Sequence, residues 1–250
     1  MQVLLRNPLA DPYVLGISGG AAVAALGAML LGMAGAWLNA AAFAGAILSM
    51  LLVFGLARGA GAWSSSRLLL TGVMVAAGWG ALISFLLTVS PDAQLRGMLF
   101  WLMGDLDNMP GYGAGVTALA IGLLLVLPLA RSLNVMARGE LAARSLGVPV
   151  AGLRVYLYLL ASLLTAMAVM TAGSIGFIGL VAPHMLRLAI GNDHRLLLPG
   201  AVLLGGSLLL LADTVARTAL APQQLPVGVV TALLGVPLFL YLLTRAQRGQ

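Results

Sequence analysis

The chain contains no cysteine and no lysine, and it has few charged residues. Without cysteine it can form neither a disulfide bond nor a thiolate metal site. Without lysine it cannot contain the phosphate-binding loop G-x-x-x-x-G-K-[ST], so we expect no nucleotide hydrolysis of that type by this chain. Charged residues make up only 8% of its 250 residues, whereas they make up about a quarter of a typical soluble domain. A soluble globular protein is therefore excluded.

Apolar residues dominate the composition, at 61% of the chain and a mean hydropathy of +1.06. Runs of about 20 apolar residues, the length that crosses a hydrocarbon core of roughly 30 Å, follow one another with short polar breaks. We therefore expect an all-α integral membrane protein with about eight transmembrane helices in a single transmembrane domain over residues 1–250. The expected spans are 14–33, 36–57, 67–89, 111–130, 151–172, 174–190, 196–219 and 226–244.

Arginine residues predict how the chain lies in the membrane, because positive side chains in short loops stay on the cytoplasmic side. If the N-terminus is inside, only Arg96 and Arg217 fall on the outer side, and all other arginines fall on the cytoplasmic side. This bias predicts that both chain ends are cytoplasmic. It also explains the pI of about 10.8 without a nucleic-acid partner.

The first polar segment, LRNPLADPYVLGISGGA from Leu5 to Ala21, precedes the first apolar run. It lacks the charged region, apolar region and small-residue cleavage site of a targeting signal. Its prolines fix the backbone angle φ, and Asn or Asp side chains cap helices through their oxygen atoms. We therefore expect a turn in which Asn7 or Asp11 caps the next helix.

Three strings occur in order along the chain: NPLADPYVLGISGGA, then GSIGFIGLVAPHMLRLAIGNDHRLLLPGAVLLGGSLLLLADTVAR, then LPVGVVTALLGVPLFLYLL. Together they resemble the FecCD-type permease family of type II ABC importers for iron–siderophore, haem and cobalamin, and the likeness runs over the full chain. The resemblance implies a normally ten-helix permease in the bacterial inner membrane, paired as a homodimer or with a paralogous permease. It also implies two cytoplasmic ABC ATPase subunits, a periplasmic substrate-binding protein, and no cofactor or metal in the permease itself.

The chain departs from the family pattern at one point, near its N-terminus. In the family the Asn-Pro-Leu-Ala-Asp-Pro loop follows the second span, whereas here it lies near Met1. This implies that the first two transmembrane helices are missing, through a miscalled start or because the chain is a fragment.

The longest break on the predicted cytoplasmic side is Arg131 to Val150, RSLNVMARGELAARSLGVPV. It is too polar to span, and its apolar pattern with Gly139 as a break suits two short amphipathic helices, although the pattern alone fits a solvated loop equally well. The resemblance implies a coupling segment at 131–150 that seats in the ATPase. Its implied contact residues are Arg138, Gly139, Glu140, Ala143, Leu146 and Gly147.

Small residues recur every four positions in the span that starts at Arg67: Gly72, Ala76, Gly80 and Ser84. Such a ridge predicts close helix packing, and at an oligomer axis it could instead face a pore. The resemblance implies that this helix flanks the translocation pathway and that the preceding Ser64, Ser65 and Ser66 lie at a cytoplasmic gate. The alternative for these serines is a plain loop.

On the predicted outer side, segment 91–110 reads PDAQLRGMLFWLMGDLDNMP and suits a short interfacial or re-entrant helix with Trp101 at headgroup level. The resemblance places this segment at the periplasmic mouth of the channel.

Asp213 and Arg217 have the i,i+4 spacing of a local ion pair near the outer end of their span. The resemblance implies that Arg217 docks the binding protein.

An ion- or proton-coupled secondary transporter is the alternative function. Such a mechanism needs an ionisable relay near mid-bilayer, but no expected span carries a central carboxylate and only His184 lies at depth. A haem-bearing or enzymatic membrane protein would need paired ligands, and only His184 and His194 are available. We therefore expect no catalytic or metal site and favour a permease that moves a bulky chelate by alternating access.

Overall fold

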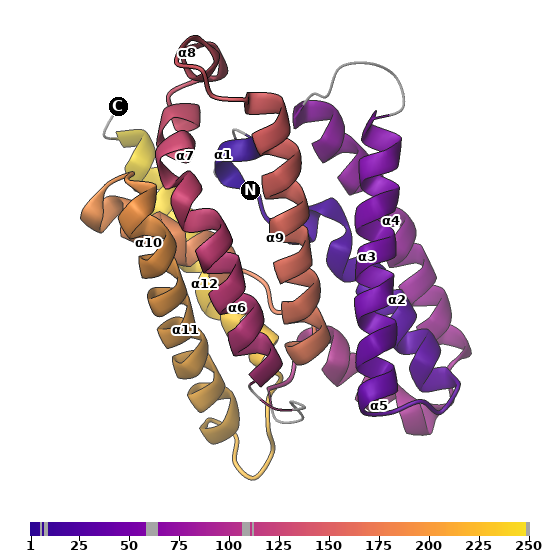
Figure 1. The fold of residues 1–250 in the computed structure, drawn as a ribbon. Coiled ribbons are helices and arrows are strands. Elements are labelled where there is room, and N and C mark those ends of the chain that lie inside the picture. Colours follow the sequence, from indigo (N-terminus) through magenta and orange to yellow (C-terminus); the bar gives the residue numbers. More distant parts are fainter. Residues whose placement is uncertain (6, 8–9, 59–64, 107–110, 112, 249–250) are drawn as a thin grey trace.

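The computed structural model describes residues 1–248 except 6, 8–9, 59–64, 107–110 and 112, and the described residues form helices and no strand (Figure 1). The first part of the chain forms α1 (Gln2–Leu5), the 3₁₀ helix η1 (Pro12–Leu15), α2 (Ile17–Leu30), α3 (Ala36–Arg58), α4 (Ser65–Val89) and α5 (Asp92–Met103). The second part forms α6 (Gly113–Val126), η2 (Leu127–Leu129), α7 (Ala130–Ala137), α8 (Glu140–Ser145), α9 (Val150–Ala172), α10 (Ile178–Ile190), α11 (His194–Thr218) and α12 (Val227–Arg248).

Within the described residues, five helices are long and apolar enough to cross a membrane: Ala36–Arg58, Ser66–Val89, Gly113–Ala137, Val150–Ala172 and His194–Thr218. Three shorter apolar helices accompany them: Ile17–Leu30, Ile178–Ile190 and Val227–Leu240. The all-α membrane fold predicted from the sequence is confirmed, since each expected span overlaps one of these helices. The span ends differ most at 111–130, whose helix continues to Ala137, and the spans 14–33 and 174–190 have helices that begin only at Ile17 and Ile178.

A non-helical bend, Gly173 to Phe177, explains the late start of α10. Gly173 ends α9 with φ of +70°, and Phe177 has φ of +69°, so neither residue continues a right-handed helix. A side chain at Gly173 would overlap the backbone carbonyl of Trp101 at the end of α5. The expected span 174–190 is therefore too long by its first turn, because this glycine brings the chain against α5 instead of continuing the helix.

The polar segment before α2 is held in the interior. Asp11 is buried, and its Oδ1 accepts a hydrogen bond from the Tyr13 backbone N–H over 2.9 Å, capping η1. The predicted cap is thereby confirmed for Asp11. The Tyr13 hydroxyl in turn accepts a hydrogen bond from the Ile175 backbone N–H over 3.2 Å. The N-terminal turn and the bend after α9, far apart in sequence, are thus directly joined.

The core lies mainly among α2, α3, α4 and α9, whose backbones approach closely at small residues. A Cβ on Gly20 would lie 2.5 Å from the Gly45 carbonyl oxygen, so α2 and α3 touch there without side chains between them. Ser49 donates to the Gly16 carbonyl over 2.7 Å and accepts from Trp79 Nε1 of α4 over 2.8 Å. Ser49 therefore connects the start of α2 with α3 and α4 through hydrogen bonds within this apolar core.

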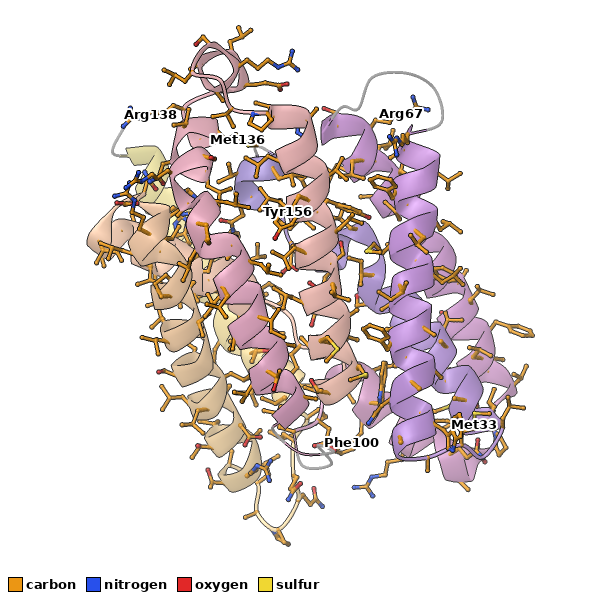
Figure 2. The ribbon with its side chains drawn as sticks, viewed as in Figure 1. Met33, Arg67, Phe100, Met136, Arg138 and Tyr156 are labelled. Atoms are coloured by element: carbon orange, nitrogen blue, oxygen red, sulfur yellow. The ribbon has the colours of Figure 1, made fainter. Side chains whose placement is uncertain are left out.

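The helices run up and down between two ends of the molecule. One end, called here the α8 end, carries α8 and the end of α12, and α1 lies in the same half of the molecule between α7 and α9 (Figure 1). The opposite end, called the α5 end, carries α5, the α2–α3 connection and the α11–α12 connection (Figure 1). Arg67 and Arg138 lie at the α8 end, and Met33 and Phe100 lie at the α5 end (Figure 2).

Candidate functional site

The segment between α6 and α9 forms a helical elbow at the α8 end. Helix α7 continues from α6 through η2 and ends at Ala137, with Arg138 as its C-cap. Gly139 then takes φ of +131°, a conformation that non-glycine residues rarely adopt, and α8 begins at Glu140. Gly147, with φ of +77°, turns the chain from α8 toward α9. The two short helices and the break at Gly139 are as the sequence pattern predicted, but the first is an extension of a span.

The elbow presents apolar side chains to the outside. Leu141 is 85% exposed and Leu146 is 71% exposed, whereas Ala143 between them is fully buried. Arg138 and Arg144 are exposed beside them. Ala143 therefore packs α8 onto the rest of the chain, and the leucines are available to a partner. Of the six predicted contact residues, Arg138, Leu146 and Gly147 are exposed and Ala143 is not.

Glu140 attaches α8 to the spans. Its carboxylate accepts from Arg144 Nη2 over 2.6 Å and from Arg154 Nη2 over 3.0 Å. Arg154 lies in the first turns of α9 and is buried, at 7% exposure. The hydrogen bond from Arg154, reinforced by Arg144, holds the pKa of the Glu140 carboxyl below its usual range. Sequence reasoning did not assign Arg154 a role, although an arginine so early in an apolar span signals a buried partner.

A second polar contact ties α7 to the junction of α10 and α11. Asn134 Nδ2 donates to Asp193 Oδ1 over 2.7 Å, and the His194 backbone N–H donates to Asn134 Oδ1 over 2.9 Å. Asp193 Oδ1 also accepts from the Arg195 backbone N–H over 3.0 Å, which caps α11. The hydrogen bond from Asn134 has the larger effect on the Asp193 carboxyl, and the one from the Arg195 backbone N–H adds to it. Together they hold the pKa of this carboxyl below its usual range. The sequence analysis had considered His194 only as a possible metal or haem ligand.

The small-residue ridge of α4 divides into two halves. At its start, Gly72 is buried and lies against Gly16. A Cβ placed on Gly16 would lie 3.5 Å from the Gly72 carbonyl oxygen and 3.3 Å from the Ala76 backbone nitrogen. Further along, Gly80 and Ser84 are exposed, and a Cβ on Gly80 would meet nothing within 4 Å. Only the first half therefore packs within this chain.

The surface of α4 is the most open of the long spans. In the most apolar stretch of α4, 6% of the residues are buried inside the chain, whereas the corresponding share for α3 is 39%. Of the three predicted gate serines, Ser65 and Ser66 begin α4, and Ser64 lies outside the described residues. Helix α4 thus has most of its surface available to lipid or to another subunit.

The α5 end contains a cavity of about 1010 Å³ between α5, the α2–α3 connection, the end of α9 and residues 222–224. Its lining includes Asn39, Arg96, Trp101 and Asp105. The Arg96 guanidinium lies 5.6 Å from the Phe100 ring centroid, a cation–π distance that orients it along α5. Polar and aromatic groups are therefore combined in one depression at this end.

The last turns of α11 carry the ion pair that the sequence predicted. Arg217 Nε lies 2.8 Å from Asp213 Oδ2, and the Arg217 side chain is 36% exposed.

His184, on α10, packs edge to face against the Phe239 ring, with 6.0 Å between the ring centroids. Among the described residues no group of three or more His, Cys, Asp or Glu side chains could hold a metal ion.

These features define a polytopic helical membrane protein with an exposed elbow at one end and a polar depression at the other. Residues 1–245 match the FecCD transport family. The chain belongs to that family and is a permease of the ABC importer type.

The chain is similar to permeases of cobalamin import systems and to a solved metal-chelate type ABC transporter. The chain is 44% identical over 247 residues to the cobalamin import system permease protein BtuC of Halobacterium salinarum, covering 97% of this chain and 66% of that relative. It is 43% identical over 252 residues to the vitamin B12 import system permease protein BtuC of Escherichia coli, covering 99% of this chain and 77% of the relative. A solved structure of a metal-chelate type ABC transporter in an inward-facing conformation matches with a TM-score of 0.86 and 32% identity, covering 98% of this chain and 79% of the other.

Proposed function

We propose that this permease imports a corrinoid such as cobalamin. The observation that carries the proposal is the 43–44% identity to cobalamin permeases from both a haloarchaeon and a bacterium, over almost all of this chain. The described spans support a bulky, weakly held cargo, because α4 offers small and apolar residues with no fixed charge along its open face. Iron–siderophore complexes and haem are the competing cargoes.

Uptake by an indicator strain tests the cargo. The permease is expressed with an ABC ATPase and a substrate-binding protein in a strain that lacks its own cobalamin permease, and entry of radiolabelled cobalamin is measured. We expect uptake that unlabelled cobalamin competes away and that excess ferric siderophore or haem does not. Uptake of a siderophore or haem without cobalamin uptake would overturn the cargo assignment while leaving the permease class intact.

The elbow is the proposed contact for a separate ATPase, which hydrolyses ATP for the complex. Arg138, Gly139, Glu140, Ala143, Leu146 and Gly147 form or support this contact. The support is the exposure of Leu141 and Leu146 on a charged helix that stands clear of the spans (Figure 1). Large exposed apolar side chains beside arginines are typical of a protein interface. Two ATPase copies, one for each permease of a dimer, would occupy such elbows.

The translocation pathway is proposed to lie between two permease copies, identical or paralogous, along the open half of the α4 ridge. Gly80 and Ser84 would face it, Gly72 and Ala76 would anchor α4 to its own chain, and Ser64, Ser65 and Ser66 would stand at the inner gate. The low burial of α4 supports this arrangement. Helix–helix association in membranes favours small residues that permit close approach.

The α5 end is proposed to face the periplasm or cell exterior, with both chain ends in the cytoplasm. The arginine bias along the sequence supports this orientation, since Arg67 and Arg138 lie together at the α8 end (Figure 2). A substrate-binding protein would then dock at the α5 end, where Arg217 is exposed enough to meet an acidic side chain. In a bacterium this places the permease in the inner membrane.

A further inference from the structure

Asn134 makes hydrogen bonds in both directions to the residues that begin α11. Its Nδ2 donates to Asp193 Oδ1 and its Oδ1 accepts from the His194 backbone N–H, over 2.7 and 2.9 Å. The same Oδ1 lies 2.7 Å from His194 Nδ1. Because a carbonyl oxygen can only accept, this contact assigns a proton to Nδ1 of His194. We call Asn134, Asp193 and His194 the α7–α11 clip.

Capping of α11 does not require the clip. Asp193 already accepts the Arg195 backbone N–H over 3.0 Å, which is sufficient for an N-cap. Asn134 comes from a different helix, 59 residues earlier in the chain. Its amide fits in one orientation only, because the reversed amide would place its NH₂ against a backbone N–H and its oxygen against a carboxylate. The clip is therefore a directional link between α7 and α11.

Besides apolar packing, two polar links connect the described residues of the elbow to the spans, and each link reaches a different helix. Glu140 joins α8 to Arg154 of α9. The clip joins α7 to α11 and, through the short connection at 191–193, to the end of α10. Helix α11 has 25 residues, which corresponds to a length of about 37 Å. Its last turns carry Asp213 and Arg217 at the opposite end of the molecule.

We propose that Asn134 is a positioning residue through which displacement of the elbow moves α11. The proposal rests on the proposed ATPase contact at the elbow. When a partner shifts α7, the clip carries the shift to the first turn of α11, and the helix, which continues past Pro199 to Thr218, transmits it toward Arg217. Without the clip, only apolar packing such as that of Leu133 connects the described residues of α7 and α11, so nucleotide turnover becomes less tightly coupled to events at the α5 end.

Exchanging Asn and Asp between positions 134 and 193 tests the clip, because the two side chains have nearly the same shape. Asn134→Asp sets a carboxylate against the Asp193 carboxylate, so the link becomes repulsive. Asp193→Asn alone removes the charge and retains a competent cap, since Asn caps helices as well as Asp. In the double variant Asn134→Asp/Asp193→Asn, the new carboxylate accepts from His194 and, once the new amide turns so that its oxygen keeps the Arg195 N–H, from the amide NH₂, which restores the link. Ser207→Ala, an exposed position on α11 whose hydroxyl bonds only within its helix, is the matched control.

Hydrogen–deuterium exchange of the purified permease in lipid nanodiscs reports on the clip without any transport. We expect amides in the first turn of α11 to exchange about tenfold faster in Asn134→Asp, because losing a hydrogen bond and gaining repulsion there favours local opening. The double variant should return to within about twofold of wild type, and Ser207→Ala should not differ. Equal exchange in all four proteins, or no recovery in the double variant, would overturn the clip itself.

Coupling is then measured in the complex with ATPase and binding protein, as cargo imported per ATP hydrolysed. We expect Asn134→Asp to lower this ratio at least fivefold while the ATPase remains bound, and the double variant to restore it. Faster exchange with an unchanged ratio would overturn the positioning role. Failure of the proposed function has a different signature, because wild type itself would then import nothing in response to ATP while the exchange pattern still appeared.

Discussion

At the scale of single residues, Glu140 holds the elbow to the spans through a buried arginine. Glu140→Gln removes the charge that partners Arg154, whose side chain is only 8% exposed. We expect a loss of about 1–2 kcal/mol of unfolding free energy, less than for a fully buried pair because Glu140 is partly exposed. Thermal unfolding in detergent measures it. Arg144→Gln is the control, since its side chain is 64% exposed and should contribute only tenths of a kcal/mol.

Acidic pH should remove the same contribution. The pKa of Glu140 is lowered in the folded protein, so its carboxylate stabilises the fold at neutral pH. That stabilisation is lost as the pH falls below the ordinary pKa of 4.5 and through the lowered folded value. The difference in unfolding temperature between wild type and Glu140→Gln should therefore shrink below this pH. A difference that grew on acidification would contradict the assigned ion pair.

Arg217 offers a residue-scale test of the proposed docking surface. Arg217→Glu reverses the charge and places two carboxylates one helical turn apart, at positions 213 and 217. We expect the affinity for the substrate-binding protein to fall at least tenfold, through lost charge complementarity, while assembly with the ATPase is retained. Titration of binding protein against the reconstituted complex measures it. Arg195→Glu, at the opposite end of α11, serves as the control, and an unchanged affinity in Arg217→Glu would remove Arg217 from the interface.

At the scale of helices, the contact between α2 and α3 depends on glycines. A Cβ on Gly45 would lie 2.5 Å from Ala24 Cβ and would also overlap the Gly20 carbonyl oxygen. Gly45→Ala should therefore push the helices apart and lower the unfolding free energy by about 1–3 kcal/mol. Gly55→Ala on the same helix meets nothing within 4 Å and should be neutral or mildly stabilising, since Ala favours helix. Equal stability of the two variants in thermal unfolding would refute this contact.

The sequence was sufficient to predict the helices but not their connections. Apolar length identified every span, because crossing a bilayer requires about 20 such residues whatever the tertiary structure. It missed the bend at Gly173–Phe177, since the residues are apolar there and only packing against α5 makes the helix stop. It also missed the partners of Asn134 and Arg154, because hydrogen bonds between distant helices leave no periodic pattern.

At the scale of the whole molecule, the first half of α4 packs against its own chain, and its second half is exposed. Gly80→Leu should fold normally, because nothing lies within 4 Å of its Cβ position. In the proposed dimer this leucine would obstruct the pathway, so we expect cargo uptake to fall at least tenfold with normal expression. Gly78→Leu is the matched control, being equally open in this chain but on another face of α4. Equal uptake by the two variants would place the pathway elsewhere.

The central claim is that this lysine-free permease draws its energy from a separate ATPase held at the elbow. Uptake of cargo into proteoliposomes containing permease, ATPase and binding protein tests it directly, with wild-type or hydrolysis-deficient ATPase and with or without an uncoupler. We predict uptake that needs ATP hydrolysis and persists when the proton gradient is abolished. Uptake that continues with the inactive ATPase and stops with the uncoupler would contradict the claim and identify a secondary transporter.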